Sequence, residues 1–443
     1  MKKTLRDGLV LRSLSEGHAS DRADLPQFYY DVFGAEGEED ADVLAPWTED
    51  LMSEAHPTMS GDNFWVVVDP AQDDRIVSAL MLIPQTWRYG HIEIPVGRPE
   101  LVATHKDYRR RGLIRALMDA AHERSAELGH LVQGITGIGH YYRQFGYAMA
   151  VDLGSRARLP FASVPPLKDD QQPQYTLREA TEADIPKLIK WDAYLGGACL
   201  MSTVRDAAQW RFELMGRQPN TPVSLFVRVI VDADGRDVGY VAFRAPEHLA
   251  FFGVMAYVVG PETSYLDTYD DVLRGMKAFA EEHYADNDEN RPANLYFDSG
   301  LPAALDTLVE RTLLGQIRHK VYAWYLRVPD TGAFIKHIAP VLEERLAGSG
   351  ANRYTGTLKI GFYDLNGLTI TFEDGCIKDA VQGEMVSGDD IGLPYHSFLN
   401  LMFGHRTLRE LEVALPEVFP SRKTAVLLDA LFPVQRSWLM ALA

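Results

Sequence analysis

The chain has 443 residues, of which 46% are hydrophobic and 24% are charged, so it has the composition of a globular protein and the length of about three domains. Its net charge of −18, from 44 basic and 62 acidic residues, disfavours nucleic acid and anionic membranes as partners and suits a small cationic substrate. No apolar run approaches the roughly 20 residues of a membrane span, and the charged N-terminal residues lack the apolar segment of a secretory signal. We therefore expect a cytoplasmic protein. The two cysteines, Cys199 and Cys376, belong to no metal-binding pattern, and we expect no metal.

The first domain, which we expect to span residues 1–160, alternates strands and helices. Short β-branched runs predict strands, and apolar residues at helical spacing after a group of arginines predict a helix. In chain order these are strands 63–69, 76–83 and 99–104, helix 113–128 and strand 131–136. A short helical turn with Tyr141 and Tyr142 follows the last strand. This order of elements predicts a mixed α/β domain.

A second α/β domain is expected over residues 175–330, after a proline-rich connection at 160–173. It opens, like the first, with a short strand and an acidic helix start. The turn signal Asp234-Gly235 joins its two central strands. These strands are predicted at 224–232 and 238–243. No basic residue stands between 257 and 267, so this domain lacks the arginine group of the first.

The last domain, residues 331–443, reads as a small α+β unit. Its alternating strands are joined at Asn366-Gly367 and at Asp374-Gly375, which are both strong hairpin signals. One face of such a sheet must be covered, and apolar helices around 395–403 and 408–413 are available for this.

The arginine group lies at Tyr108 to Leu113, at the start of the predicted helix. A helix start leaves about four backbone N–H groups unpaired and carries a partial positive charge, so it attracts phosphate. Gly112 lets a ligand approach the backbone, and the run Arg109–Arg111 can grip phosphate through paired hydrogen bonds. By itself, the run is also compatible with a solvated helix start or a basic surface patch.

The run Arg109–Ile114 resembles the pyrophosphate loop (Gln/Arg)-x-x-Gly-x-(Gly/Ala) of the GCN5-related N-acetyltransferases (the GNAT superfamily), and departs from it at Ile114. Together with Tyr142–Tyr147, which reads Tyr-x-x-Phe-Gly-Tyr, it resembles the Eis-like (enhanced intracellular survival) branch over essentially the entire chain. The resemblance implies two tandem GNAT-like domains with mixed sheets, the second without a working coenzyme loop, and then a sterol-carrier-like α+β domain. These correspond to residues 1–160, 175–330 and 331–443. It also implies acetyl-CoA as the cosubstrate and a homo-oligomer, either a trimer or a hexamer.

The same resemblance carries binding residues onto this chain. The implied coenzyme contacts are Val102, Ala103, Thr104, Arg110, Arg111, Gly112, Leu113, Ile114, Arg115, Gly137 and Ile138. Asp31 matches an acidic position of the family's amine pocket, and Trp47 is expected to line the same cavity.

The catalytic groups are implied in the same way. Tyr142 would be the proton donor, and a tyrosine with a pKa of about 10 is suited to protonate a thiolate whose conjugate acid is near 8.5. The C-terminal carboxylate of Ala443 would be the general base, acting through water. His105 and His140 are alternative bases, because histidine titrates near neutrality.

The leading hypothesis is an acetyl-CoA-dependent N-acetyltransferase, an acyltransferase that transfers an acetyl group to an amine of a small cationic substrate. The alternative is a non-catalytic acyl-CoA-binding sensor or carrier, in which the third domain holds an apolar ligand. A scaffold that serves only oligomerisation is the third hypothesis. The enzyme should turn over acetyl-CoA, the sensor or carrier should bind it without turnover, and the scaffold should not bind it.

Overall fold

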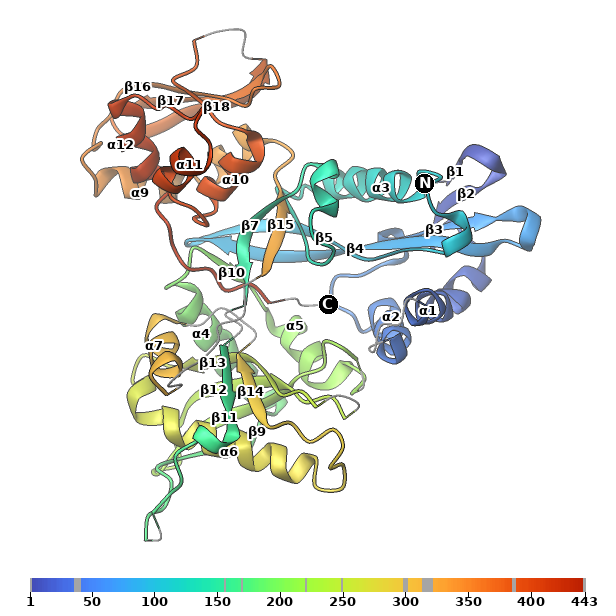
Figure 1. Cartoon of the computed structure of the whole chain (residues 1–443), viewed down its shortest axis with the longest axis vertical. Helices are drawn as coiled ribbons and strands as arrows, with labels where there is room; N and C mark the ends of the chain where they lie inside the picture. The colour runs from blue at the N-terminus through green and yellow to red at the C-terminus, as the bar shows by residue number, and fades with distance from the viewer. Residues whose placement is uncertain are drawn as a thin grey trace.

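The computed structural model describes residues 2–35, 41–154, 157–168, 170–219, 221–247, 250–297, 302–312, 322–384 and 388–440. Within these ranges the strands form a nine-stranded, a six-stranded and a four-stranded sheet. Figure 1 shows three bodies, with the nine-stranded sheet between the other two. The predicted mixed α/β class is confirmed. None of the described helices is long and apolar enough to cross a membrane.

The nine-stranded sheet contains two strands that are longer than predicted. In order across the sheet, its strands are β1 (Lys2–Thr4), β2 (Val10–Ser13), β3 (Phe64–Asp69), β4 (Arg75–Tyr89), β5 (Ile92–Thr104), β6 (Val132–Ile135), β15 (Tyr322–Arg327) and β7 (Ala148–Leu153), with β10 (Met201–Thr203) beside β4. β4 and β5 form one antiparallel hairpin that turns at Gly90, whose φ is 58°. The sequence pattern missed its outer part, because Pro84 and Pro95 interrupt the runs that signal a strand.

Helices cover both faces of this sheet. α1 (Ala19–Gly34) and α2 (Leu44–Met52) pack on one face and α3 (Leu113–Glu127) on the other, as Figure 1 shows. Alternate residues of β3 contribute to the two cores, because successive side chains of a strand point to opposite faces. The helix predicted at 113–128 is confirmed by α3.

Three strands pair with strands that lie far from them in the sequence. β15 follows the second α/β unit along the chain, but it lies between β6 and β7 of the first. β8 (Ala157–Pro160) follows the first unit but pairs with a strand of the six-stranded sheet, and β10 pairs with β4. The sheets therefore exchange strands across the expected limits, and the division into three domains stays a prediction.

The six-stranded sheet is the core of the second unit. Its strands are, in order, β8, β14 (Asn294–Phe297), β13 (Gly253–Val259), β12 (Asp237–Arg244), β11 (Phe226–Asp232) and β9 (Tyr175–Glu179). Its helices are α4 (Ile185–Gly196), α5 (Ala207–Arg211), α6 (Tyr265–His283) and α7 (Ala303–Thr312). The predicted turn between β11 and β12 is confirmed, with Gly235 at a φ of 80°. Buried Arg205 donates to both carboxylate oxygens of Asp192 in α4 at 2.9 Å and so ties the start of α5 to α4.

The third unit is an α+β module in which one predicted turn is displaced. Its strands are β18 (Cys376–Glu384), β17 (Asn366–Glu373), β16 (Gly356–Gly361) and β19 (Ile391–Gly392). Its helices are α8 (Thr331–His337), α9 (Ala339–Ala347), α10 (Tyr395–Met402), α11 (Leu408–Ala414) and α12 (Arg422–Leu431). The turn at Asp374-Gly375 is confirmed, but the one at Asn366-Gly367 is wrong, because both residues pair within β17. The reversal lies at 363–365, and this register places Leu368 opposite Ile360 in the core.

Candidate active site

A cavity of about 870 Å³ opens where β5 and β6 diverge. Among the described residues these parallel strands pair at Val96 with Val132 and at Gly97 with Gln133. Beyond these positions, the end of β5 and the loop after β6 both line the cavity. Because the described pairing with β6 stops at Gly97, the backbone of β5 beyond it lacks a strand partner on this edge and can hydrogen-bond a ligand.

The start of α3 forms one side of the cavity. α3 follows Gly112, whose φ of 77° lies in the left-handed region that glycine adopts without strain. The described residues supply no side-chain cap at this helix start, so its first N–H groups remain open to a ligand. Leu113, Ile114 and Arg115 of the first turn line the cavity. An uncapped helix start with partial positive charge is suited to bind phosphate.

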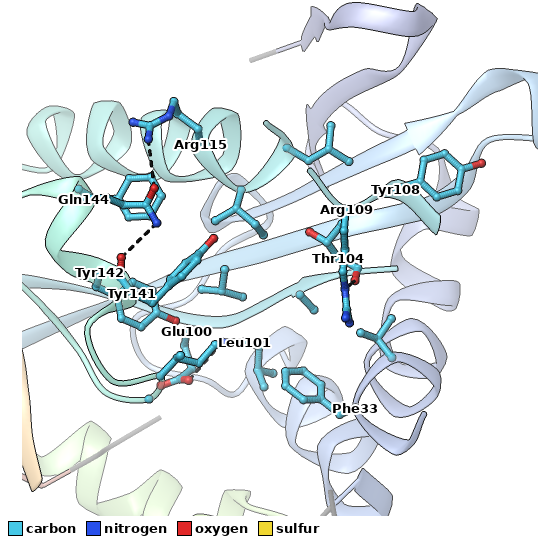
Figure 2. A pocket seen from close by; sticks show the side chains of 18 of the residues that line it. Phe33, Glu100, Leu101, Thr104, Tyr108, Arg109, Arg115, Tyr141, Tyr142 and Gln144 are labelled. Atoms are coloured by element: carbon cyan, nitrogen blue, oxygen red, sulfur yellow. Dashed lines mark hydrogen bonds between the residues drawn. The ribbon is translucent and has the colours of Figure 1, made fainter. Parts of the chain in front are cut away.

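The arginines around this helix start differ in orientation. Arg110 lines the cavity from a loop position with a φ of 63°, and no described residue pairs with its guanidinium. Arg115 also lines it, and its Nη2 donates to Oε1 of Gln144 at 3.2 Å (Figure 2). Arg111 lies outside the lining, because its guanidinium stacks on the ring of Tyr108 at 4.8 Å and donates to a backbone carbonyl. Two of these arginines therefore offer charge to an anion in the cavity.

A β-bulge in β5 shapes the opposite wall. β5 has one residue more than β4 between the paired positions Ala79–Ala103 and Met81–Glu100. Leu101 lies in this bulge with a φ of 48°. Bulges change the direction of side chains at the edges of sites, and both Glu100 and Leu101 line the cavity here.

Glu100 is a carboxylate held in place on this wall. Its side chain is 15% exposed, and it forms an ion pair with Arg98, which is 2% exposed. Oε1 of Glu100 also accepts the N–H of Leu101 at 3.2 Å. Burial lowers the pKa of Arg98 below its ordinary value, and the charge of Glu100 opposes that shift. Arg98 in turn lies 5.5 Å from the centre of the Trp324 ring in β15.

Tyr142 lines the cavity near Glu100 (Figure 2). Its side chain is buried, with the rings of Tyr141 and Tyr325 centred 5.4 and 5.6 Å from its own. Burial raises the pKa of Tyr142 above its ordinary value, and the negative charge of Glu100 raises it further. The phenol is therefore protonated at neutral pH and able to donate.

Two tyrosines of β15 hold the loop that precedes Tyr142. The hydroxyl of Tyr322 donates to the carbonyl of Gly137, and the hydroxyl of Tyr325 accepts the N–H of His140. Burial raises the pKa of Tyr322 to about 12, so this hydroxyl also stays protonated. A strand from residues beyond 320 thus fixes the cavity wall of the first unit.

Most of the predicted binding residues come together in this cavity. Those that line it are Trp47, Val102, Ala103, Thr104, Arg110, Gly112, Leu113, Ile114, Arg115, Gly137, Ile138 and Tyr142. Arg111 and Asp31 are not among the lining residues. Asp31 lies on the exposed side of α1, where its Oδ1 accepts from Nε2 of Gln27 at 2.8 Å.

Of the three residues predicted as possible general bases, the structure describes His105 and His140. Neither His105 nor His140 lines the cavity. Ala443 lies outside the described residues. The chain before it returns to the nine-stranded sheet, where the N–H of buried Met440 donates to Oγ1 of Thr203 at 2.9 Å.

Several lining residues were missed by sequence reasoning. These are Val32, Phe33, Leu44, Glu100, Leu101, Thr136, Tyr141, Gln144 and Phe145, whereas Tyr108 and Arg109, which also line the cavity, belong to the predicted arginine group. Glu100 carried a signal, because it is the only acidic residue between positions 94 and 105, before the arginine loop. Tyr322 and Tyr325 carried none, because nothing local indicates that β15 enters the first sheet.

The sequence of the first unit has a family match that agrees with this fold and this cavity. Residues 14–150 match the family model of the acetyltransferase (GNAT) domain. No curated protein matches the chain by sequence.

Three solved structures share the fold over nearly the whole chain. A GCN5-related N-acetyltransferase from Anabaena variabilis is 14% identical, with a TM-score of 0.63 over 97% of this chain and 99% of its own. One from Kribbella flavida is 17% identical, with a TM-score of 0.60 over 97% of each chain. Eis1 from Mycobacterium abscessus is 15% identical, with a TM-score of 0.54 over 97% of this chain and 98% of its own. The chain therefore carries a GNAT acetyltransferase domain within a fold that Eis1 shares, and the predicted resemblance is confirmed.

Proposed function

We propose that the chain is an acetyl-CoA-dependent N-acetyltransferase that acetylates an amine of a small cationic substrate. One observation carries this proposal: a single cavity is lined by the uncapped start of α3, by Arg110 and Arg115, and by Tyr142. The helix start and the arginines suit the pyrophosphate of coenzyme A. The phenol of Tyr142 is protonated and lines the cavity, so it is placed to give a proton to the thiolate that leaves during acetyl transfer.

The proposed reaction uses the diverging edge of β5. Backbone groups of Val102–Thr104 would hydrogen-bond the coenzyme arm and stabilise the oxyanion that forms on the thioester oxygen. The neutral amine attacks the thioester carbon, and the C–S bond breaks as the amide forms. The thiolate takes the proton of Tyr142. The proton lost by the nitrogen passes through water to a base, for which the C-terminal carboxylate of Ala443 is our candidate.

The decisive assay follows thiol release from acetyl-CoA in the presence of aminoglycosides, polyamines, lysine peptides and alkylamines. Tyr142→Phe should lower kcat by about 10²- to 10⁴-fold, the usual contribution of a general acid, and leave acetyl-CoA affinity unchanged. Tyr141→Phe, on the neighbouring ring, is the matched control and should retain activity. Binding without turnover in the wild type would favour the sensor or carrier. Absence of acetyl-CoA binding would favour the scaffold.

The candidate base has its own test. One glycine added after Ala443 moves the terminal carboxylate by about 3.5 Å, and it should lower kcat while acetyl-CoA binding is retained. Unchanged kcat would assign the base elsewhere. The cytoplasmic location, the trimeric or hexameric assembly and the sterol-carrier-like nature of the third unit stay predictions from the sequence.

A further inference from the structure

We infer that the acceptor is a primary monoamine with an apolar body, and that Glu100 binds its ammonium group. This inference rests on the proposed function and specifies its acceptor. It concerns the end of the cavity away from the start of α3, where the coenzyme is proposed to bind.

The described wall at this end is mostly apolar, and its one charge besides that of Glu100 is the cationic Arg109, whose Nε donates to the carbonyl of Thr104 at 3.3 Å (Figure 2). It is built by α1, α2 and the bulge of β5, and Figure 2 shows Glu100 and Leu101 between the tyrosine pair and Phe33. Its apolar side chains are Val32, Phe33, Leu44, Trp47 and Leu101. Asp31, the acidic residue expected here, points to solvent instead. The wall therefore favours a substrate body without charge.

Glu100 is the only carboxylate among the described residues that line the cavity. A carboxylate has about four lone-pair sites, and the described contacts of Glu100 are those with Arg98 and the Leu101 amide. Sites therefore remain for an ammonium group. Because these two contacts and the bulge fix the side chain, Glu100 can bind an amine without first being ordered.

The position of Glu100 relates the ammonium site to the reaction. Glu100 and Tyr142 line the same cavity and lie close together in Figure 2, and the charge of the carboxylate also raises the pKa of the phenol. An amine held at Glu100 is therefore near the group proposed to protonate the thiolate. The bound ammonium first loses a proton through water to the base proposed above, because only the neutral amine can attack the thioester. A second ammonium on the same molecule would meet the apolar wall, where it would lose hydration without gaining a partner.

The first test compares two amines of the same size on the wild-type protein. n-Pentylamine and 1,4-diaminobutane each have six non-hydrogen atoms, and they differ in a terminal methyl or ammonium group. We expect kcat/KM for pentylamine to exceed that for diaminobutane by at least about 10-fold, the effect of desolvating an unpaired charge. Equal values, or a preference for diaminobutane, would overturn the inference.

The second test removes the carboxylate. Glu100→Gln retains an oxygen for Arg98 but no charge, and it should lower kcat/KM for pentylamine by about 10- to 100-fold with unchanged acetyl-CoA affinity. Glu93→Gln, an exposed position in the same strand, is the matched control and should have no effect. Glu100→Asp retains the charge and should lie between the wild type and Glu100→Gln. If Glu100→Gln matches its control, the inference fails.

The outcomes separate the inference from the function it rests on. Turnover of polyamines in preference to monoamines would leave the N-acetyltransferase standing and reject the acceptor class. Absence of turnover with every amine would reject both. The amine pair needs no variant, so it decides the matter even if Glu100→Gln does not fold.

Discussion

The two α/β units contain strands and helices in the same order, but the helix at the centre of that order begins differently in each unit. In each, an antiparallel strand pair leads through a helix to a parallel strand, as β4, β5, α3 and β6 in one unit and β12, β13, α6 and β14 in the other. The strand before the helix carries a bulge in both, between Glu100 and Ala103 in β5 and between Val254 and Ala256 in β13. Fold alone therefore does not distinguish them.

The helix starts do distinguish them. α3 begins after Gly112 without a side-chain cap, beside arginines that face the cavity. α6 is capped by Ser264, whose hydroxyl accepts the N–H of Leu266 at 3.0 Å, and it has Asp267 in its first turn. An acidic, capped start both occupies the free N–H groups and repels an anion. If the first unit binds coenzyme A as proposed, this difference assigns the binding of its phosphates to a few residues at one helix start.

The strands beside these helices differ as well. In the second unit the hydroxyl of Tyr265 donates to the carbonyl of Tyr257 at 3.2 Å and accepts the N–H of Val259 at 3.4 Å. It thus occupies backbone groups near the end of β13. The corresponding end of β5 lines the open cavity. In the second unit, a side chain of its own occupies the place where the first unit can accept a ligand.

Among the changes that test this comparison, reversing the charge at the start of α3 should have the largest effect, which is on acetyl-CoA binding. The double variant Arg110→Glu/Arg115→Glu should weaken acetyl-CoA binding by about 100-fold or more, because two charge-assisted hydrogen bonds contribute about 1.5–3 kcal/mol each. Lys277→Glu in α6 is the matched control and should leave binding unchanged. Calorimetric titration measures both. Undiminished binding in the double variant would mean that the helix starts do not explain the difference between the units.

Replacing one glycine in each unit should have a smaller effect. It should lower the free energy of unfolding in both units and weaken acetyl-CoA binding only in the first. Gly112 and Gly235 have φ of 77° and 80°, and a Cβ at either would meet no atom within 4 Å. Alanine at either position should cost about 1 kcal/mol of unfolding free energy, because left-handed backbone strains a residue with a Cβ. Only Gly112→Ala should also weaken acetyl-CoA binding, since it alters the backbone at the helix start. Equal binding by both variants would show that the conformation of Gly112 is not needed.

Sequence reasoning succeeded where the signal was local. The helix start at Gly112 and the apolar spacing of α3 are properties of one short segment, and the structure reproduces them. The place of β15 in the first sheet was not predictable, because a strand's partner depends on contacts distant in the chain. The same holds for Glu100, whose orientation depends on a bulge that only the pairing of β4 with β5 defines. Local patterns thus identified the half of the cavity at the start of α3 and missed most of the apolar half.

The smallest expected effect comes from Tyr265 in the second unit. Tyr265→Phe removes the hydroxyl that meets β13 and should cost about 1 kcal/mol, or about 2–4 °C in Tm for a unit of this size. Tyr194→Phe, at a position that is 52% exposed, is the control and should leave Tm unchanged. Activity and a stoichiometry of one acetyl-CoA per chain should persist in both variants, because the start of α6 remains capped and acidic. A second acetyl-CoA bound by Tyr265→Phe would show that this hydroxyl, rather than the helix start, closes the site in the second unit.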